Sequence, residues 1–244
     1  MILPRLIAHR GAHQNAPENT LKAFQNAAAL GAQMFECDVL LTHDQVPVIF
    51  HDDTLERCTN GQGKIREMPY AYLKTLDAGQ GEAIPTLQQV LAWLEHTPML
   101  MNLELKYTHN NAAPQPLVQQ VCTQLASMQS RILVSSFNLE ALYTLRQTLP
   151  HIHIGLLIDS TNLKAYGLAG IAEYYRVIQA YSIHCDWQLL QPKQIKGFLK
   201  ISPHLLAYTV NDKQIAQQLF TQGISGVFTD QLVFEHYTAD IFIY

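Results

Sequence analysis

Short apolar runs alternate with stretches of helical spacing along most of the chain. The apolar runs begin near residues 6, 35, 99, 131, 153, 182, 205 and 226, and each has the length of a buried strand. The stretches between them repeat apolar residues every three to four positions, as in Leu87, Val90, Leu91 and Leu94 after a Thr86 cap. This order indicates parallel strands joined by right-handed crossovers. Residues 160–180 show no clear pattern.

Eight strand and helix units predict an α/β fold of the (β/α)8 TIM-barrel type, and the alternative is a doubly wound open sheet. We favour the barrel because chemically active side chains lie in or just after the strands, where barrels carry their sites. A chain of 244 residues has the length of one such barrel, so we expect a single domain over residues 1–244. The side chains in question are His9, Arg10, Glu36, Asp38, Glu104, Lys106 and Asn211.

Residues 35–52 predict a second strand that continues into a hairpin. Glu36 and Asp38 share one face of this strand because successive side chains point to opposite sides, and the other face is apolar. A two-residue turn at 44–45 makes paired positions sum to 89 and places Asp38 opposite His51, within one residue of register. We therefore expect an imidazole close to a pair of carboxylates.

The segment that follows the hairpin is rich in glycine and polar residues and has little periodic apolarity. We expect it to form a small inserted lobe after the second strand, at about residues 53–82 and over one end of the fold. Its composition predicts little core of its own.

Composition narrows the class of protein. With 48% hydrophobic and 15% charged residues, the chain can bury a sizeable core. Its net charge is −4 and it has no run of lysine or arginine, which disfavours binding to nucleic acid or to an anionic membrane. The sequence leaves the oligomeric state open.

Cysteine usage and hydropathy predict a cytoplasmic protein. The four cysteines lack Cys-x-x-Cys spacing, so neither a zinc site nor a disulfide framework is indicated, and a reducing compartment fits. The chain shows no signal-peptide hydrophobic region and no apolar run near the roughly 18 residues of a membrane span. We therefore expect a soluble protein without stable membrane association.

Three carboxylates are candidate metal ligands. Glu104 lies two residues before Lys106, so both side chains point to the same face of a strand. Together with Glu36 and Asp38, Glu104 completes a set that suits a hard divalent ion such as Mg²⁺ or Ca²⁺, with Mn²⁺ as a further option. The alternative is a structural ion pair between Glu104 and Lys106, with the hairpin acids in solvent.

Two histidines and two cations complete the candidate site. His9 and His51 are expected at the same rim as the carboxylates, where a pair of imidazoles can divide general acid and general base work. Arg10 and Lys106 supply fixed positive charge for an anionic substrate. Phosphate fits better than carboxylate, because a metal and two cations would overcompensate a single charge.

The ordered set of motifs resembles the glycerophosphodiester phosphodiesterase family. Order and spacing match from His9 to Asp230, which is nearly the whole chain. The motifs are His9-Arg10-Gly11, Pro17-Glu18-Asn19-Thr20, Glu36-Cys37-Asp38-Val39, Pro47-Val48-Ile49-Phe50-His51-Asp52, Asn102-Leu103-Glu104-Leu105-Lys106, Thr209-Val210-Asn211 and Gly226-Val227-Phe228-Thr229-Asp230.

The resemblance implies an enzyme that hydrolyses small-molecule glycerophosphodiesters to sn-glycerol 3-phosphate and an alcohol. By position it implies that His9 and His51 act as acid and base and that Arg10 and Lys106 bind phosphate. The metal ligands it implies are Glu36, Asp38 and Glu104. The family often has tryptophan before Thr-x-Asn, whereas this chain has Tyr208, so the pocket wall near the alcohol group is expected to differ.

Two other functions compete with this interpretation. A phospholipase C of the phosphatidylinositol type also uses two histidines, but it needs a membrane-binding surface, and no basic amphipathic stretch is evident. A barrel that binds a phosphodiester without turnover need not keep both histidines. Attack by a neighbouring glycerol hydroxyl, through a cyclic phosphate, and direct attack by water both stay open, as does the assignment of acid and base.

Overall fold

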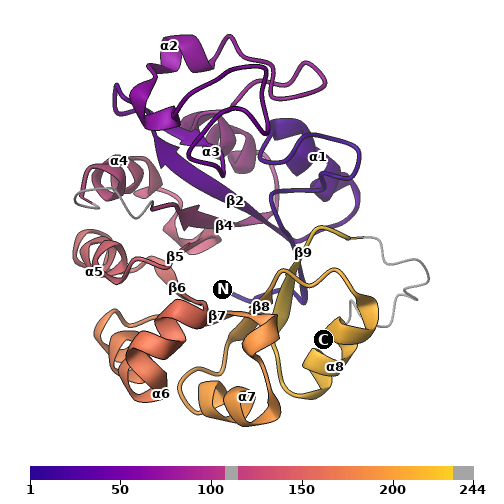
Figure 1. The fold of residues 1–244 in the computed structure, drawn as a ribbon, viewed down its shortest axis with the longest axis vertical. Helices are drawn as coiled ribbons and strands as arrows, with labels where there is room; N and C mark the ends of the chain where they lie inside the picture. The colour runs from indigo at the N-terminus through magenta and orange to yellow at the C-terminus, as the bar shows by residue number, and fades with distance from the viewer. Residues whose placement is uncertain (108–114, 233–244) are drawn as a thin grey trace.

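Eight parallel strands close into a ring with helices around it (Figure 1). The computed structural model describes residues 1–107 and 115–232. The ring follows the order β1-β9-β8-β7-β6-β5-β4-β2 and closes where β1 pairs with β2, which confirms the (β/α)8 TIM barrel. The strands are β1 (Leu6–Ala8), β2 (Met34–Leu41), β4 (Leu100–Leu105), β5 (Ile132–Ser136), β6 (His153–Ile158), β7 (Ser182–Asp186), β8 (Leu205–Tyr208) and β9 (Gly226–Thr229).

The helices pack against the outer face of the ring through their apolar stripes. Side-chain caps begin several of them, for example Thr20 before α1 and Thr86 before α3, as their Thr-initiated sequences predict. The helices are α1 (Leu21–Ala29), α3 (Leu87–Glu95), α4 (Gln115–Leu125), α5 (Leu139–Thr148), α6 (Ser160–Val177), α7 (Pro192–Leu199) and α8 (Lys213–Thr221). Helix α6 occupies the stretch without a clear sequence pattern. Its periodicity is interrupted because Gly167 has a φ of 57° inside it.

Residues 42–46 connect the two arms of the hairpin, closed by a hydrogen bond from the Thr42 N–H to the Val46 carbonyl, in place of the expected two-residue turn. Strand β3 (Pro47–Ile49) pairs antiparallel with β2, with Val39 opposite Ile49. Gln45 adopts a left-handed φ of 63°, which allows the longer loop. Paired positions therefore sum to 88 (39 and 49), and Asp38 lies opposite Phe50, whose N–H donates to the Asp38 carbonyl. The observed pairing differs from the expected one by a single residue, which is within the range predicted from the sequence.

The segment between β3 and α3 forms the inserted lobe, residues 53–82, which lies at the top of Figure 1. It contains a short 3-10 helix (Ile65–Glu67) and α2 (Tyr70–Leu73). Leu55, Ile65 and Leu73 are buried and cluster with apolar residues of the hairpin. The expectation of little core was wrong, because the few apolar side chains come from irregular segments that show no period yet converge on one place. The single domain over residues 1–244 stays a prediction, since it reaches residues outside the described ranges.

Inside the ring the strands carry apolar side chains near their amino ends and polar ones farther along. Met34 and Leu133 belong to an internal apolar cluster, whereas Glu36, Asp38 and Asn102 are buried polar residues on β2 and β4. This gradient places the polar groups toward the carboxyl ends of the strands, where barrel enzymes build their sites.

His184 is a fully buried imidazole on β7. Its Nε2 lies 2.8 Å from Ser182 Oγ, and Gly155 on the next strand leaves room for the ring, since a Cβ there would lie 2.5 Å from its atoms. Burial lowers the pKa of His184 to about 3, so the folded protein holds it neutral at pH 7.

Leu55→Ala should test whether the inserted lobe has a real core. We expect the free energy of unfolding to fall by roughly 2–5 kcal/mol, because the side chain is fully buried and its removal leaves a cavity. Urea unfolding measures the change. Leu30→Ala is the matched control, since Leu30 is 55% exposed and should change stability by less than about 0.5 kcal/mol. Equal effects of the two substitutions would mean that the lobe cluster adds no stability.

His184 should make stability depend on pH. Its folded pKa lies below the unfolded value of about 6.5, so its contribution is intact above that value and declines as the pH falls toward about 3. Between pH 7 and pH 5 the loss should be about 2 kcal/mol. Urea unfolding of wild type and His184→Asn at both pH values measures it. The variant should show a smaller pH dependence, and identical slopes would contradict the assignment.

Candidate active site

Three carboxylates from two neighbouring strands converge at the carboxyl end of the barrel. Glu36 and Asp38 alternate on β2, and the register of β2 with β4 pairs Asp38 with Glu104. Their oxygens lie within 4.8 Å of one another. Glu36 and Asp38 are almost fully buried. The three acids predicted to converge therefore do so, which gives a donor set of the kind that a hard divalent ion prefers.

The close approach of these acids perturbs their ionisation. Burial, then the charges of Asp38 and Glu104, raise the pKa of Glu36 well above its usual range. Burial also raises the pKa of Glu104, against the effect of Lys106. Burial acts on Asp38 in the same direction, but Lys106 and Arg10 outweigh it and lower its pKa. The ionised forms of Glu36 and Glu104 are therefore unfavourable in this cluster.

Lys106 and Arg10 are the cations next to the acids. Lys106 Nζ lies 2.9 Å from Glu104 Oε1 and 3.6 Å from Asp38 Oδ1. Arg10 Nε lies 3.4 Å from Asp38 Oδ2, and its Nη1 donates to Glu18 Oε1 at 2.8 Å. The Arg10 backbone N–H also donates to Glu36 Oε2 at 2.9 Å. Both predicted cations are thus held by the carboxylates, and both side chains also line the cavity described below.

The turn after β1 places Arg10 by an unusual backbone path. Arg10 has a φ of 55° and Gly11 a φ of 83°. A Cβ at Gly11 would lie 2.7 Å from the Ala23 backbone, so only glycine lets the loop approach α1 this closely. The left-handed backbone of these two residues turns the Arg10 N–H toward Glu36. This hydrogen bond holds the loop next to the three carboxylates.

The two predicted histidines come from different segments, His9 just after β1 and His51 just after β3, and each is held by a carboxylate. His9 Nδ1 lies 2.7 Å from Asp230 Oδ1, and His51 Nδ1 lies 2.6 Å from Asp52 Oδ1. A carboxylate accepts, so Nδ1 is the donor in each pair, and in the neutral form of each ring Nε2 keeps a lone pair. This leaves one ring nitrogen of each histidine for proton transfer.

Sequence reasoning missed the residues that hold the histidines. Asp230 lies beside His9 because β1 and β9 pair Ala8 with Thr229, the residues just before them. His13 Nε2 and Asn211 Nδ2 also contact the Asp230 carboxylate, at 3.0 and 2.6 Å. Burial opposes the ionised form, but the hydrogen bonds from His13 and His9 outweigh it and hold the pKa of Asp230 far below its usual range.

The motifs contained the missing residues. Asp52, Asn211 and Asp230 all stand in the resemblance motifs, but neither their type nor their spacing showed which histidine each would meet. The signal that could have found Asp230 is the closure of a barrel, which brings the ends of its first and last strands together.

A cavity of about 210 Å³ opens at this end of the barrel. Its lining includes six of the seven predicted site residues, and the seventh, Asp38, contacts both Arg10 and Lys106. The structure therefore brings all seven together, and their individual roles stay predictions. The six that line the cavity are His9, Arg10, Glu36, His51, Glu104 and Lys106.

Tyr208 forms part of the cavity wall. Its hydroxyl donates to the Ile158 carbonyl at 2.9 Å, and its ring meets Phe137 edge-on with 6.1 Å between the centroids. Because the hydroxyl is engaged, Tyr208 adds an aromatic surface to the wall.

Within residues 1–107 and 115–232, the helices are all too short or too polar to cross a bilayer.

Comparison with known proteins identifies the family. The model of the glycerophosphoryl diester phosphodiesterase family matches residues 9–233. A glycerophosphodiester phosphodiesterase of Caldanaerobacter subterraneus is 32% identical over 238 residues, which cover 92% of this chain and 93% of the relative.

Solved structures agree with this match. A phosphodiesterase of Oleispira antarctica, in complex with the product sn-glycerol-3-phosphate, is similar with a TM-score of 0.83 and 33% identity over 93% of each chain. A glycerophosphodiester phosphodiesterase of Thermotoga maritima is similar with a TM-score of 0.76 and 27% identity, over 95% of this chain and 96% of the other. The chain therefore belongs to the glycerophosphoryl diester phosphodiesterase family.

Proposed function

We propose that this chain, a glycerophosphodiester phosphodiesterase, releases sn-glycerol 3-phosphate and an alcohol by metal-dependent catalysis with two histidines. One observation carries the proposal: His9 and His51 line one cavity beside three convergent carboxylates, and a carboxylate engages Nδ1 of each ring. Phosphodiester hydrolysis needs charge neutralisation, a nucleophile and a protonated leaving group. This constellation has groups for each need.

The carboxylates fit a divalent ion, and we assign Glu36, Asp38 and Glu104 as its ligands. The raised pKa values of Glu36 and Glu104 reflect burial and repulsion that a cation would relieve. Glu36 Oε1 is buried and has no hydrogen-bond partner within the described ranges. All-oxygen donors favour Mg²⁺ or Ca²⁺, with Mn²⁺ as a further option. Such an ion would polarise the phosphoryl group and offset its charge.

Charge balance supports an anionic substrate. Three carboxylates against Arg10 and Lys106 leave one excess negative charge when all five are ionised. A divalent ion reverses the excess to one positive charge, which favours an anionic substrate such as a phosphodiester. We assign Arg10 and Lys106 to the phosphate, Arg10 through its planar guanidinium and Lys106 as a point charge.

The histidines are the proton-transfer groups in this proposal. With Nδ1 protonated and bound to Asp230 or Asp52, Nε2 can accept a proton, and the protonated ring can donate one to the leaving oxygen. The same arrangement serves two routes. In one a neighbouring glycerol hydroxyl attacks phosphorus and water later opens the cyclic phosphate, and in the other water attacks directly.

The competing functions have less support. The family match is to glycerophosphoryl diester phosphodiesterases, which favours them over a phosphatidylinositol-type phospholipase C. A barrel that only binds phosphodiesters does not need a carboxylate behind each histidine. We propose small-molecule glycerophosphodiesters as the substrates, and the cytoplasmic location stays a prediction.

Chelation should abolish activity. Without a cation the three acids present negative charge to the phosphate, so protein dialysed against EDTA should release no sn-glycerol 3-phosphate from glycerophosphocholine. Adding back Mg²⁺, Ca²⁺ or Mn²⁺ separately should restore turnover with at least one ion. Metal content is checked by elemental analysis, and full turnover by metal-free protein would show the ligand assignment to be wrong.

His9→Ala and His51→Ala should each lower kcat by roughly 10²–10⁴-fold, the scale of general acid–base catalysis. The double variant should be scarcely slower than either single one, because groups that act in the same step are non-additive. Steady-state kinetics and thermal unfolding measure activity and stability, and Tm should change little.

His151→Ala is the matched control, since His151 is exposed and lies at the opposite end of β6 from the site. It should keep wild-type kcat. Near-normal turnover by His51→Ala, with activated and unactivated leaving groups alike, would remove His51 from the mechanism.

A further inference from the structure

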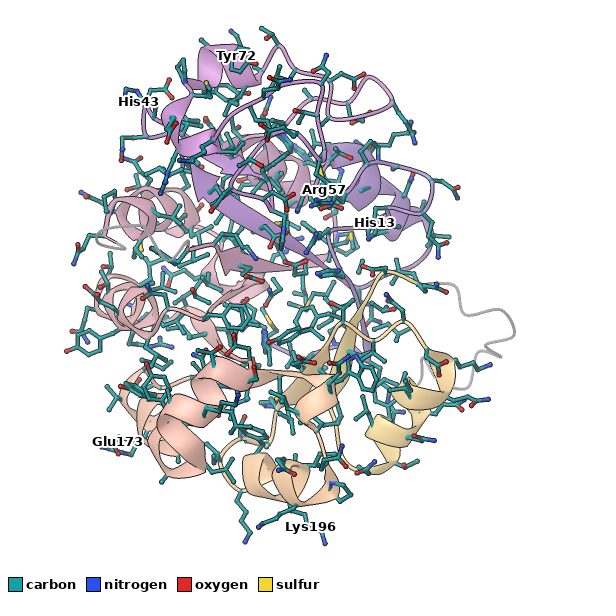
Figure 2. The ribbon with its side chains drawn as sticks, viewed as in Figure 1. His13, His43, Arg57, Tyr72, Glu173 and Lys196 are labelled. Carbon is teal, nitrogen blue, oxygen red and sulfur yellow. The ribbon has the colours of Figure 1, made fainter. Side chains whose placement is uncertain are left out.

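Arg57, in the inserted lobe, joins two carboxylates through both edges of its guanidinium. Its Nε donates to Asp52 Oδ2 at 2.5 Å and its Nη2 to Asp52 Oδ1 at 2.8 Å. Its Nη1 donates to Glu18 Oε2 at 2.9 Å and its Nη2 to Glu18 Oε1 at 2.8 Å. Bidentate pairs fix the orientation of the carboxylate as well as its position. Figure 2 shows Arg57 where the inserted lobe meets the barrel.

Each of these carboxylates also holds a residue of the proposed site. Asp52 Oδ1 accepts from His51 Nδ1 at 2.6 Å. Glu18 Oε1 accepts from Arg10 Nη1 at 2.8 Å. Arg57 is therefore connected through Asp52 to His51, the proposed proton-transfer group. It is connected through Glu18 to Arg10, the proposed phosphate-binding group.

The backbone that carries Arg57 is well anchored. Leu55 is fully buried in the lobe cluster, and its carbonyl accepts from Thr59 N–H at 3.0 Å. The Gly63 N–H donates to Glu56 Oε1 at 2.8 Å, which ties the two sides of the turn together. The position of Arg57 is therefore set by the fold of the inserted lobe.

The charges in this network are permanent near neutral pH. Arg57 is the main cause that holds the pKa of Asp52 far below its usual range. Burial opposes ionisation of Glu18, but Arg57 and Arg10 outweigh it and lower its pKa to about 2. Both carboxylates stay ionised acceptors, so the network keeps its hydrogen bonds under the conditions of catalysis.

We propose that Arg57 is a positioning residue through which the inserted lobe orients His51 and Arg10. The inference rests on the proposed roles of those two residues. Without the guanidinium, Asp52 and Glu18 lose the partner that fixes their carboxylates, and the imidazole and the phosphate-binding guanidinium gain rotational freedom. Small misplacements of catalytic groups lower rates without a change in chemistry.

A surface ion pair is the simpler explanation, and its expected effects differ. The Arg57 side chain is 47% exposed, and exposed ion pairs contribute little to stability. The carboxylates it binds, however, are only 18% and 23% exposed, and each also contacts a site residue. An ordinary ion pair predicts unchanged kinetics, whereas a positioning role predicts altered kinetics with small effects on stability.

Arg57→Gln tests the proposal in the metal-loaded enzyme with glycerophosphocholine. We expect kcat to fall by roughly 10–100-fold, the range found for groups that orient ligands and catalysts, with a raised KM and a nearly unchanged Tm. Arg57→Lys keeps the charge but cannot bridge both carboxylates in the same way, so it should also lose activity.

Arg176→Gln is the matched control. Arg176 Nη2 lies 2.6 Å from Glu173 Oε1 in an exposed pair, and Glu173 lies at the outer edge of the molecule, far from Arg57 (Figure 2). This variant should keep wild-type kcat and KM, which separates a lost surface charge from lost positioning.

Two further measurements tie the effect to the network. The losses of Arg57→Gln and Asp52→Asn should be non-additive in the double variant, because both act on His51. Guanidinium ion at concentrations well below those that denature should partly restore kcat to Arg57→Ala, since the side chain it replaces is half exposed, and should not affect Arg176→Ala.

The outcomes separate this inference from the proposed function. A wild-type protein that releases no sn-glycerol 3-phosphate with any of the three metals contradicts the proposed function. An active wild type with Arg57→Gln and Arg57→Lys both within twofold of Arg176→Gln overturns the positioning role. Should Arg57→Gln fail to fold, a folded Arg57→Lys with wild-type kcat and KM overturns it equally.

Discussion

The convergence of three carboxylates within 4.8 Å of one another, two of them buried, is the constraint on which the rest of the site depends. Such a cluster is unfavourable in a low-dielectric interior unless cations compensate it. Lys106 and Arg10 supply part of that compensation from the ends of β4 and β1. Burial, together with the repulsion between the acids, raises the pKa values of Glu36 and Glu104, and a bound cation would relieve that repulsion.

Different kinds of chain segment carry the different groups of the site. The strands of the ring supply the acids, because alternation and register alone fix where Glu36, Asp38 and Glu104 point. The histidines come from loops, and each loop residue is then held by a further carboxylate. Rigid strands thus carry the charged cluster, and hydrogen-bonded loops carry the groups that would exchange protons.

Periodicity and strand spacing were enough to predict the barrel, its eight strands and the convergence of seven site residues, because these follow from local patterns and from one topological rule. The register of the hairpin was not predictable to the residue, since it depends on the left-handed backbone of Gln45. The core of the inserted lobe and the partners Asp230 and Arg57 were missed for a related reason. They are set by tertiary contacts between segments that carry no periodic signal.

The pairing of β1 with β9 places Ala8 opposite Thr229 and so creates the contact of His9 with Asp230, which are separated by 221 positions in the chain. Bringing such distant residues together carries the entropic cost of closing a very long loop, and contacts of this kind form late in folding. The His9–Asp230 pair can therefore exist only after the first and last strands have met. On the proposed role of His9, turnover therefore requires the closed ring, and a chain whose first and last strands have not yet met would lack activity even if its β2–β4 acids were already in place.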